Sequence, residues 1–257
     1  MPTASGDGVS LYYETAGSGE TVAFVGDAGL GAWQWGHQFE GVAGPRQALV
    51  WDYRGVGRSD DPPGPVDVDV LAGDLEAVLA DAGVDRAHLV GAGLGGMVAL
   101  RYARAYSRAR SLALFGTAAS GEEFNEAALR ALHPVTMAAD AVRASLEGAF
   151  SAPFLEGEDL VGRILDWRRE EDATGEALEF LLAATLGFEA GPLHEVVLPT
   201  TVFHGVDDPV GPASAGEALA DGLPRAEFVP VEGRHLAHFE HGPAVTDRLV
   251  TFLESVE

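Results

Sequence analysis

The sequence contains no cysteine and no lysine. The absence of cysteine excludes disulfides, thiolate metal ligands and a cysteine nucleophile. All 16 basic residues are arginine, and the sequence also contains 40 acidic residues, so the net charge is −24 at pH 7. Because such a surface repels nucleic acid and anionic membranes, we expect neither as a partner. The same imbalance predicts adaptation to very high salt, as in a halophile, where self-repulsion is screened.

Targeting signals are also lacking. The N-terminal region has neither a basic segment nor a long apolar stretch, so we expect no secretory signal, no membrane span and a cytoplasmic protein. The 257 residues, 47% of them hydrophobic, can bury one large core, with a single domain and an insertion as the natural outcome. The composition does not fix an oligomeric state.

Short apolar runs alternate with helical periodicity along most of the chain. The expected strands are 9–15, 21–25, 48–52, 87–91, 111–116, 200–205 and 226–231, and the expected helices are 66–82, 95–106, 213–221 and 243–256. The first two strands are predicted to form an opening hairpin around a Gly-Ser-Gly turn. Alternation of this kind predicts an α/β fold with a doubly wound, mostly parallel sheet that carries helices on both faces.

One interval breaks that alternation. Residues 118–196 are rich in alanine, leucine and glutamate, and their periodicity predicts only helices, at 122–132, 135–149, 158–171 and 175–187. We therefore divide the chain into a core domain of residues 1–117 and 197–257 and a helical insertion of residues 118–196.

A glycine-rich turn follows the strand at 87–91. Residues 87–100 have the sequence AHLVGAGLGGMVAL, a short apolar strand, a tight turn and the start of an apolar helix. A nucleophile elbow has the pattern G-x-S-x-G, which presents its serine above the sheet. Gly93 stands at the serine position here. The elbow is predicted, but its nucleophilic hydroxyl is absent.

Four further segments accompany this elbow: FVGDAGLGAW (24–33), WDYRGVGRSD (51–60), FHGVDDPV (203–210) and VEGRHLAHFE (231–240). With them the chain resembles the α/β-hydrolase-fold superfamily over nearly its whole length. Elbow, acid and histidine follow one another in the order that this fold uses. The resemblance implies that residues 118–196 form a helical cap inserted after the sixth strand. Trp167 is then one of the cap aromatics expected to contact a substrate.

The resemblance also implies roles for particular residues. His235 corresponds to the catalytic histidine, and Asp208, in preference to the adjacent Asp207, corresponds to the acid that orients it. The backbone N–H groups of Ala28 and Leu94 correspond to the oxyanion hole, the donors that stabilise the developing negative charge.

The early loop departs from the family, because Gly26-Asp27 stands where a His-Gly pair is usual. If Asp27 points inward, it can oppose an oxyanion, act as a general acid, anchor a substrate or pair with an arginine. If it points outward, it is one more surface acid. The sequence leaves these alternatives open.

Three hypotheses about function follow, each for a small organic ligand without metal or cofactor. The first is an enzyme in which the His235–Asp208 dyad acts as a general base in non-covalent hydrolase- or lyase-type chemistry. The second is a catalytically inactive pseudo-hydrolase that binds a ligand or partner. The third is a serine esterase whose nucleophile has been removed. Ser59, Thr117 and Ser120 lie in neighbouring loops, but no tight turn presents them as Gly93 is presented.

Overall fold

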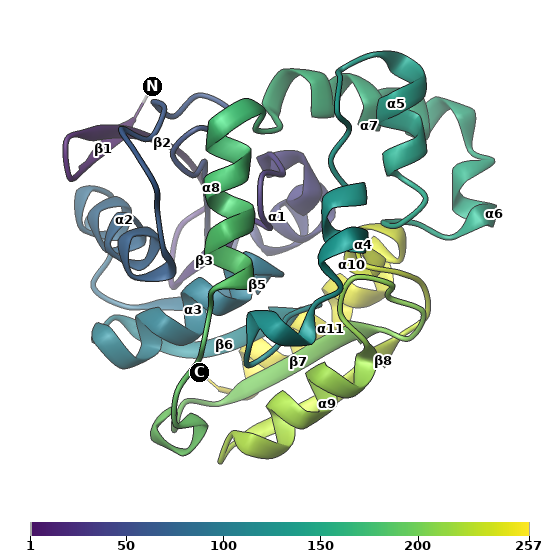
Figure 1. The fold of residues 1–257 in the computed structure, drawn as a ribbon. Coiled ribbons are helices and arrows are strands. Elements are labelled where there is room, and N and C mark those ends of the chain that lie inside the picture. The colour runs from purple at the N-terminus through teal and green to yellow at the C-terminus, as the bar shows by residue number, and fades with distance from the viewer. Residues whose placement is uncertain (1, 257) are drawn as a thin grey trace.

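In a computed structural model, which describes residues 2–256, one eight-stranded sheet runs through the molecule (Figure 1). Its order is β1-β2-β4-β3-β5-β6-β7-β8, and all pairs from β4 to β8 are parallel. The strands are β1 Thr3–Gly6, β2 Val9–Ala16, β3 Thr21–Val25, β4 Gln47–Trp51, β5 Ala87–Ala92, β6 Ala109–Phe115, β7 Thr200–Gly205 and β8 Ala226–Val231. This is the predicted doubly wound α/β fold.

The predicted opening hairpin is wrong. β2 does not pair with β3, because β4 lies between them and pairs antiparallel with β2 and parallel with β3. The hairpin instead joins β1 to β2, with Gly6 opposite Val9. Its two turn residues, Asp7 and Gly8, both have positive φ angles, of 50° and 86°, which is the geometry that an Asp-Gly turn between strands favours.

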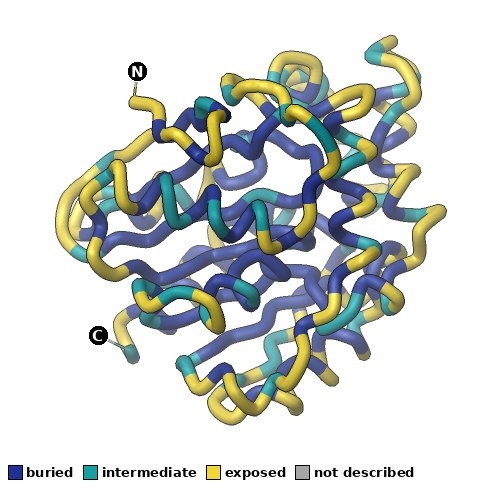
Figure 2. Tube along the Cα trace, turned by 60° about the vertical axis from the view of Figure 1, so that its left-hand side comes forward, coloured by how far each residue is buried: buried dark blue, intermediate teal, exposed yellow. Residues whose placement is uncertain are grey.

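The sheet is covered on both faces, and its central strands, β3 to β7, are almost wholly buried (Figure 2). Alternate residues of β3 show how: Val22 and Phe24 pack into one hydrophobic cluster, and Ala23 and Val25 into the other. The first cluster lies under α1 (Gly36–Val42) and α11 (Gly242–Ser255). The second lies under α2 (Val68–Asp81), α3 (Leu94–Ala105) and α9 (Ala213–Gly222). α10 (Ala237–Glu240) and the 3₁₀ helix η1 (Ala32–Trp35) complete the core.

Residues 118–196, which we call the cap segment, contain helices and no strand of the sheet. This cap segment contains η2 (Gly121–Glu123), α4 (Glu126–Ala131), α5 (Ala139–Ser145), α6 (Ala152–Leu155), α7 (Glu158–Glu171), α8 (Gly175–Leu186) and η3 (Leu193–Glu195). α7 contacts η1 and α8 contacts α3, so the cap segment packs on the core beside the elbow. α7 and α8 match their predicted ranges closely, whereas α5 is shorter than predicted. α1 and α6 are additional helices, too short to give a clear periodicity.

No helix within residues 2–256 has the length and apolar character needed to cross a membrane.

Candidate active site

Gly93 stands at the apex of a tight turn between β5 and α3. Its φ of +48° and ψ of −114° are strained for a residue with a side chain. The turn is held from β6 and the loop after it: Gly93 N donates to Phe115 O at 2.9 Å, and Thr117 Oγ1 donates to Gly93 O at 2.7 Å. A Cβ on Gly93 would lie 1.9 Å from Asp27 Oδ1. The elbow is therefore formed as predicted, and the space above it is occupied.

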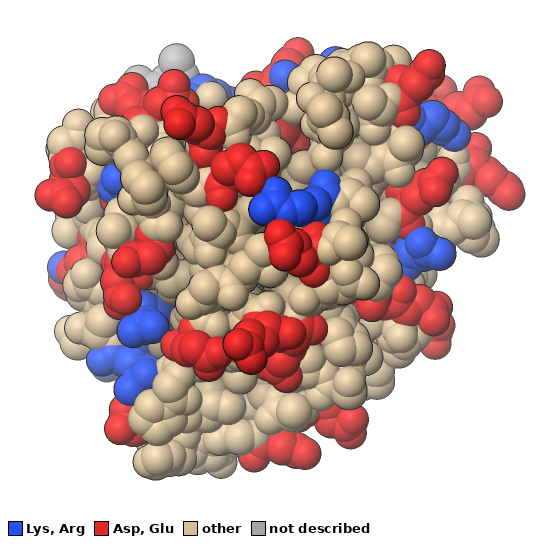
Figure 3. Space-filling view, in the orientation of Figure 1, with Lys and Arg blue, Asp and Glu red and all other residues tan. Residues whose placement is uncertain are grey.

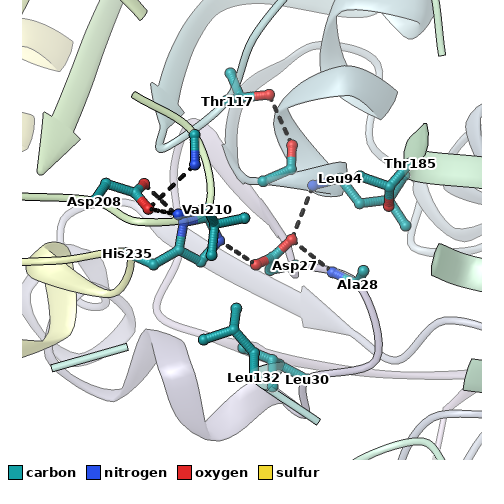
Figure 4. Close-up of polar contacts among 12 residues, drawn as sticks. Asp27, Ala28, Leu30, Leu94, Thr117, Leu132, Thr185, Asp208, Val210 and His235 are labelled. Atoms are coloured by element: carbon teal, nitrogen blue, oxygen red, sulfur yellow. Dashed lines mark hydrogen bonds and ion pairs between the residues drawn. The ribbon is translucent and has the colours of Figure 1, made fainter. Parts of the chain in front are cut away.

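Asp27 fills that space. Only 1% of its surface is exposed. Its Oδ1 accepts hydrogen bonds from Ala28 N at 2.7 Å and Leu94 N at 2.9 Å, and its Oδ2 lies 2.9 Å from His235 Nε2 (Figure 4). The two N–H groups predicted to form an oxyanion hole do converge, but on a carboxylate of the chain itself. An outward Asp27 and an Asp27 paired with an arginine are both wrong.

His235 and Asp208 form the predicted contact. His235 Nδ1 lies 2.8 Å from Asp208 Oδ2, and Asp208 Oδ1 accepts from Val210 N at 2.8 Å and Gly211 N at 3.3 Å. Asp207 is exposed and takes no part in this contact. The second ring nitrogen of His235 faces Asp27. Its imidazole thus bridges two carboxylates.

The electrostatics follow from this bridge. Burial works against a charged His235, but the charges and hydrogen bonds of Asp208 and Asp27 raise its pKa to about 10. Burial also opposes ionisation of Asp27, yet the hydrogen bond and charge of His235, with the N–H groups of Leu94 and Ala28, hold the pKa of that carboxyl below its usual value. His235 and His204 lower the pKa of Asp208 against the same burial. At neutral pH the three groups form a carboxylate–imidazolium–carboxylate set, which we call the Asp27–His235–Asp208 bridge.

Comparison with known proteins places this geometry in context. The alpha/beta hydrolase family model matches residues 22–248. The chain belongs to that family. A protein of Azorhizobium caulinodans, provisionally named as a carbamate hydrolase, is 28% identical and covers 91% of each chain. A 2-hydroxy-6-oxononadienedioate/2-hydroxy-6-oxononatrienedioate hydrolase of Paraburkholderia phymatum is 31% identical over 96% of this chain and 92% of its own. A hydrolase structure from Pseudomonas aeruginosa superposes with a TM-score of 0.84 at 28% identity, covering 97% and 96%.

Three further histidines of this α/β hydrolase surround the bridge. His204 is buried, and its Nε2 lies 2.9 Å from Gly211 O and 3.3 Å from Asp208 Oδ2. His238 packs against Trp35, and burial lowers its pKa to about 3. Burial also lowers the pKa of His133, on the cap segment, to about 3. The last two imidazoles are neutral at pH 7, so the positive charge of the bridge belongs to His235.

The neighbouring hydroxyls have structural partners. Ser59 Oγ donates to Asp52 O at 2.7 Å, and Ser120 Oγ donates to Glu189 Oε1 at 2.6 Å. Thr117 is the closest of the three to the elbow, where it holds the carbonyl of Gly93. This role was not visible in the sequence, because Thr117 follows β6 in an ordinary loop. None of these residues stands in for the missing serine.

Trp167 lies on α7, half-buried, with the guanidinium carbon of Arg163 4.8 Å from its ring centre. Its contact with a substrate stays a prediction. Among residues 2–256, no group of three or more histidine, aspartate or glutamate side chains has an arrangement that suits a metal ion.

Proposed function

We propose that this chain is a hydrolase of small organic molecules in which the carboxylate of Asp27 replaces the elbow serine as nucleophile. One observation carries the proposal: Oδ1 of Asp27 accepts from both oxyanion donors, and Oδ2 faces His235 above a glycine. A carboxylate held in this way is pre-positioned by backbone dipoles, and carboxylates are established covalent nucleophiles. The names of the relatives, which are hydrolases, support the reaction class.

In the first step Oδ2 attacks an electrophilic sp³ carbon that carries a leaving group. A carbon–oxygen bond forms to Asp27, and the bond to the leaving group breaks. The leaving group takes the electron pair and a proton from the His235 imidazolium. Asp27 becomes a neutral ester whose carbonyl oxygen, Oδ1, stays between Ala28 N and Leu94 N.

In the second step the predicted dyad works as a general base. Esterification removes one of the two negative charges that raise the pKa of His235, so its Nε2 is free to accept a proton. Water attacks Cγ of Asp27 and gives its proton to His235, and the charge that develops on Oδ1 is stabilised by the two N–H groups. Collapse breaks the bond between Cγ and the alkyl-bearing oxygen, and the leaving alkoxide takes the proton from His235 to become the alcohol. The carboxylic acid that remains gives its proton back to His235, which restores the carboxylate and the imidazolium. The net reaction converts R–X and water into R–OH and HX.

The relation between Gly93 and Asp27 favours this proposal over an esterase that has merely lost its serine. A side chain at position 93 and a carboxylate at position 27 compete for the same space, since the Cβ would lie 1.9 Å from Oδ1. An esterase that has only lost its serine has no reason to carry, at position 27, a carboxylate that fills the space above Gly93. The two residues are complementary, as they are in a site built around Asp27.

A second candidate is a binding protein without turnover. The observation in its favour is burial: Asp27 is 1% and His235 5% exposed, and both oxyanion donors are already paired. A carbonyl substrate therefore finds no vacant oxyanion hole in the closed structure. Such a protein binds its ligand elsewhere or without chemistry.

A single-turnover experiment in H₂¹⁸O separates the candidates. Enzyme in excess is incubated with short bromoalkanes and terminal epoxides, and the peptide that contains Asp27 is weighed by mass spectrometry. Attack by Asp27 leaves ¹⁸O in its carboxylate, because water adds to Cγ and the alcohol keeps the original Oδ2. Direct attack of water on the substrate, with the dyad as base, leaves the label in the product and overturns the proposal.

Variants sharpen this test. In His235→Gln the second step lacks its base. With a bromoalkane, whose bromide leaves without taking a proton, the alkyl ester on Asp27 should therefore accumulate. Asp27→Asn should abolish turnover, and Asp207→Asn, which changes the exposed neighbour of Asp208, should leave turnover unchanged. Ligand binding without any product across the panel favours the binding protein and also overturns the proposal.

A further inference from the structure

The bridge is closed off from solvent by the cap segment and the loop that follows Asp27. A Cβ on Gly29, two residues after Asp27, would lie 2.6 Å from Leu178 Cδ1 and 3.3 Å from His133 Cε1. Leu178 comes from α8 and His133 from the loop after α4. Because Asp27 is 1% exposed, any molecule that reaches it must first displace side chains of this kind.

One short stretch of the cap segment holds the closing loop in place. Asp172 Oδ1 accepts from Gly31 N at 3.0 Å and from Trp33 Nε1 at 2.9 Å. Glu171 Oε2 accepts from Trp33 N at 3.1 Å, and Ala173 N donates to Gly29 O at 2.8 Å. The end of α7 thus bonds the loop that carries Asp27 at four points.

A buried arginine ties this stretch to the rest of the cap segment. Arg168 Nε donates to Asp172 Oδ2 at 2.6 Å, and the two side chains are 2% and 1% exposed. Its remaining nitrogens donate to Ser145 Oγ and to Leu132 O, each at 2.7 Å. The guanidinium of Arg168 therefore links α7 to α5 through Ser145 and to Leu132, the residue before His133.

A cavity of about 710 Å³ lies outside this closure. Its two walls are the loop that begins at His133 and the start of α8. Its lining includes His133, Pro134, Met137, Thr174, Leu178 and Leu182. His133 and Leu178 thus face the cavity and also pack on Gly29. One wall begins beside Leu132, whose carbonyl accepts from Arg168. The other begins beside Ala173, which follows Asp172 in the chain and donates to Gly29 O.

We propose that Arg168 and Asp172 form a latch that keeps the cap closed over Asp27, and that the site opens from this cavity between His133 and Leu178. The pair positions the loop of Asp27 when it is formed, and its release separates the two walls. The lining is mostly apolar. Of its charged side chains, Arg130 is paired with Glu126 and Glu179, and Glu176 is exposed to solvent. The cavity therefore suits an uncharged, largely apolar molecule. The proposal goes beyond the proposed function, because a latch closes the site whether or not Asp27 is a nucleophile.

Access to Asp27 tests the latch without any turnover. The protein is labelled with a water-soluble carbodiimide and glycine ethyl ester, and the rate is followed at Asp27 and at Asp74 by peptide mass spectrometry. Asp74 is a buried carboxylate paired with Arg54 in the core, away from the cap segment, and it reports global unfolding. In Arg168→Met we expect labelling of Asp27 at least about tenfold faster than in the parent, with the rate at Asp74 unchanged.

Arg169→Met is the matched control, since it breaks an exposed arginine–aspartate pair on the same helix as Arg168, outside the lining of the cavity, and should change neither rate. Arg168→Lys keeps the charge but not the three-way fork, and should recover part of the parent's protection. If Arg168→Met does not fold, Leu178→Ala widens the same opening without leaving a buried charge, and should also accelerate labelling at Asp27. Equal rates at Asp27 in parent and folded variants, or parallel acceleration at Asp27 and Asp74, overturns the latch.

Discussion

Two carboxylates flank His235, and their surroundings differ. Asp208 lies behind the imidazole, where Val210 N, Gly211 N and the imidazole of His204 bond it from core elements. Asp27 lies in front, where two N–H groups of the oxyanion hole hold it and the cap segment covers it. Asp208 is thus held by the core, whereas Asp27 occupies the space above Gly93. The same chemical group thus has partners from the core on one side of His235 and, in the function that we propose, is the nucleophile on the other.

A serine at position 93 gives the largest expected effect, which is a gain of esterase activity. Gly93→Ser alone places a Cβ against Asp27 Oδ1 at 1.9 Å, so we expect a destabilised protein without esterase activity. Gly93→Ser with Asp27→Gly removes the overlap and empties the oxyanion hole. Hydrolysis of nitrophenyl acetate should then rise about 10³-fold or more above the parent, because nucleophile, base and oxyanion donors are assembled together.

Burst kinetics and an acyl group trapped on residue 93 are the measurements for this prediction. Asp27→Gly alone is the control, since it empties the hole without supplying a nucleophile. Esterase activity in the Gly93→Ser single variant would contradict the view that positions 27 and 93 compete for one space.

Removal of each carboxylate separately tests the contrast in their roles. Asp208→Ala leaves a buried histidine beside unpaired N–H groups of the core, and we expect a loss of about 3–5 kcal/mol in the free energy of unfolding. Asp27→Gly leaves two N–H groups that water can reach once the side chain is gone, so about 1–3 kcal/mol is expected. Urea unfolding of both variants checks the order. A larger loss for Asp27→Gly would mean that Asp27 is the main structural support.

The pH dependence of stability follows from the pKa of His235, which both carboxylates raise from 6.5 to about 10. A pKa raised in the folded state stabilises fully below pH 6.5, and this contribution is lost as pH rises through about 10. The free energy of unfolding should therefore fall over that interval by at least about 2 kcal/mol.

In Asp27→Asn only Asp208 still stabilises the imidazolium, so the fall should be smaller and end at a lower pH. Histidine NMR titration of parent and variant measures both pKa values directly. A His235 in the parent that titrates near 6.5 would show that the bridge is not ionic.

Some of this site was predictable from the sequence. The glycine-rich turn at 91–95 follows from a short local segment between a strand and a helix. The contact of His235 with Asp208 and the convergence of Ala28 N with Leu94 N were implied by the resemblance of their segments to the family's motifs. The direction of Asp27 was not predictable, since one carboxylate can turn inward or outward on the same backbone. Only the absence of a side chain at Gly93 could have indicated the space it fills.

Less of the cap segment was predictable from the sequence. Arg168 and Asp172 lie in a run of charged residues, RREED at 168–172, which resembles a solvated helix end. Only the fold brings these two side chains to 2% and 1% exposure. The opening hairpin was mispredicted for a related reason, because strand order depends on contacts between distant segments. β4 follows α1 in the sequence, yet it lies between β2 and β3 in the sheet.

The smallest expected effect concerns salt, and it separates surface charge from buried charge. Acidic side chains form patches across the whole face in Figure 3, with fewer arginine patches between them, and the net charge is −24. Because salt screens exposed charges within a few ångströms and buried pairs much less, molar KCl should relieve the surface repulsion and leave the Asp27–His235–Asp208 bridge intact.

We expect the unfolding midpoint to rise by roughly 3–10 °C, about 1–3 kcal/mol, between low salt and about 2 M KCl. Thermal melts across that range measure it, and parallel NMR titration should give the same His235 pKa at both extremes. A flat or falling midpoint would remove the argument for adaptation to high salt, and a His235 pKa that drops with salt would mean that solvent ions reach a site which the structure buries.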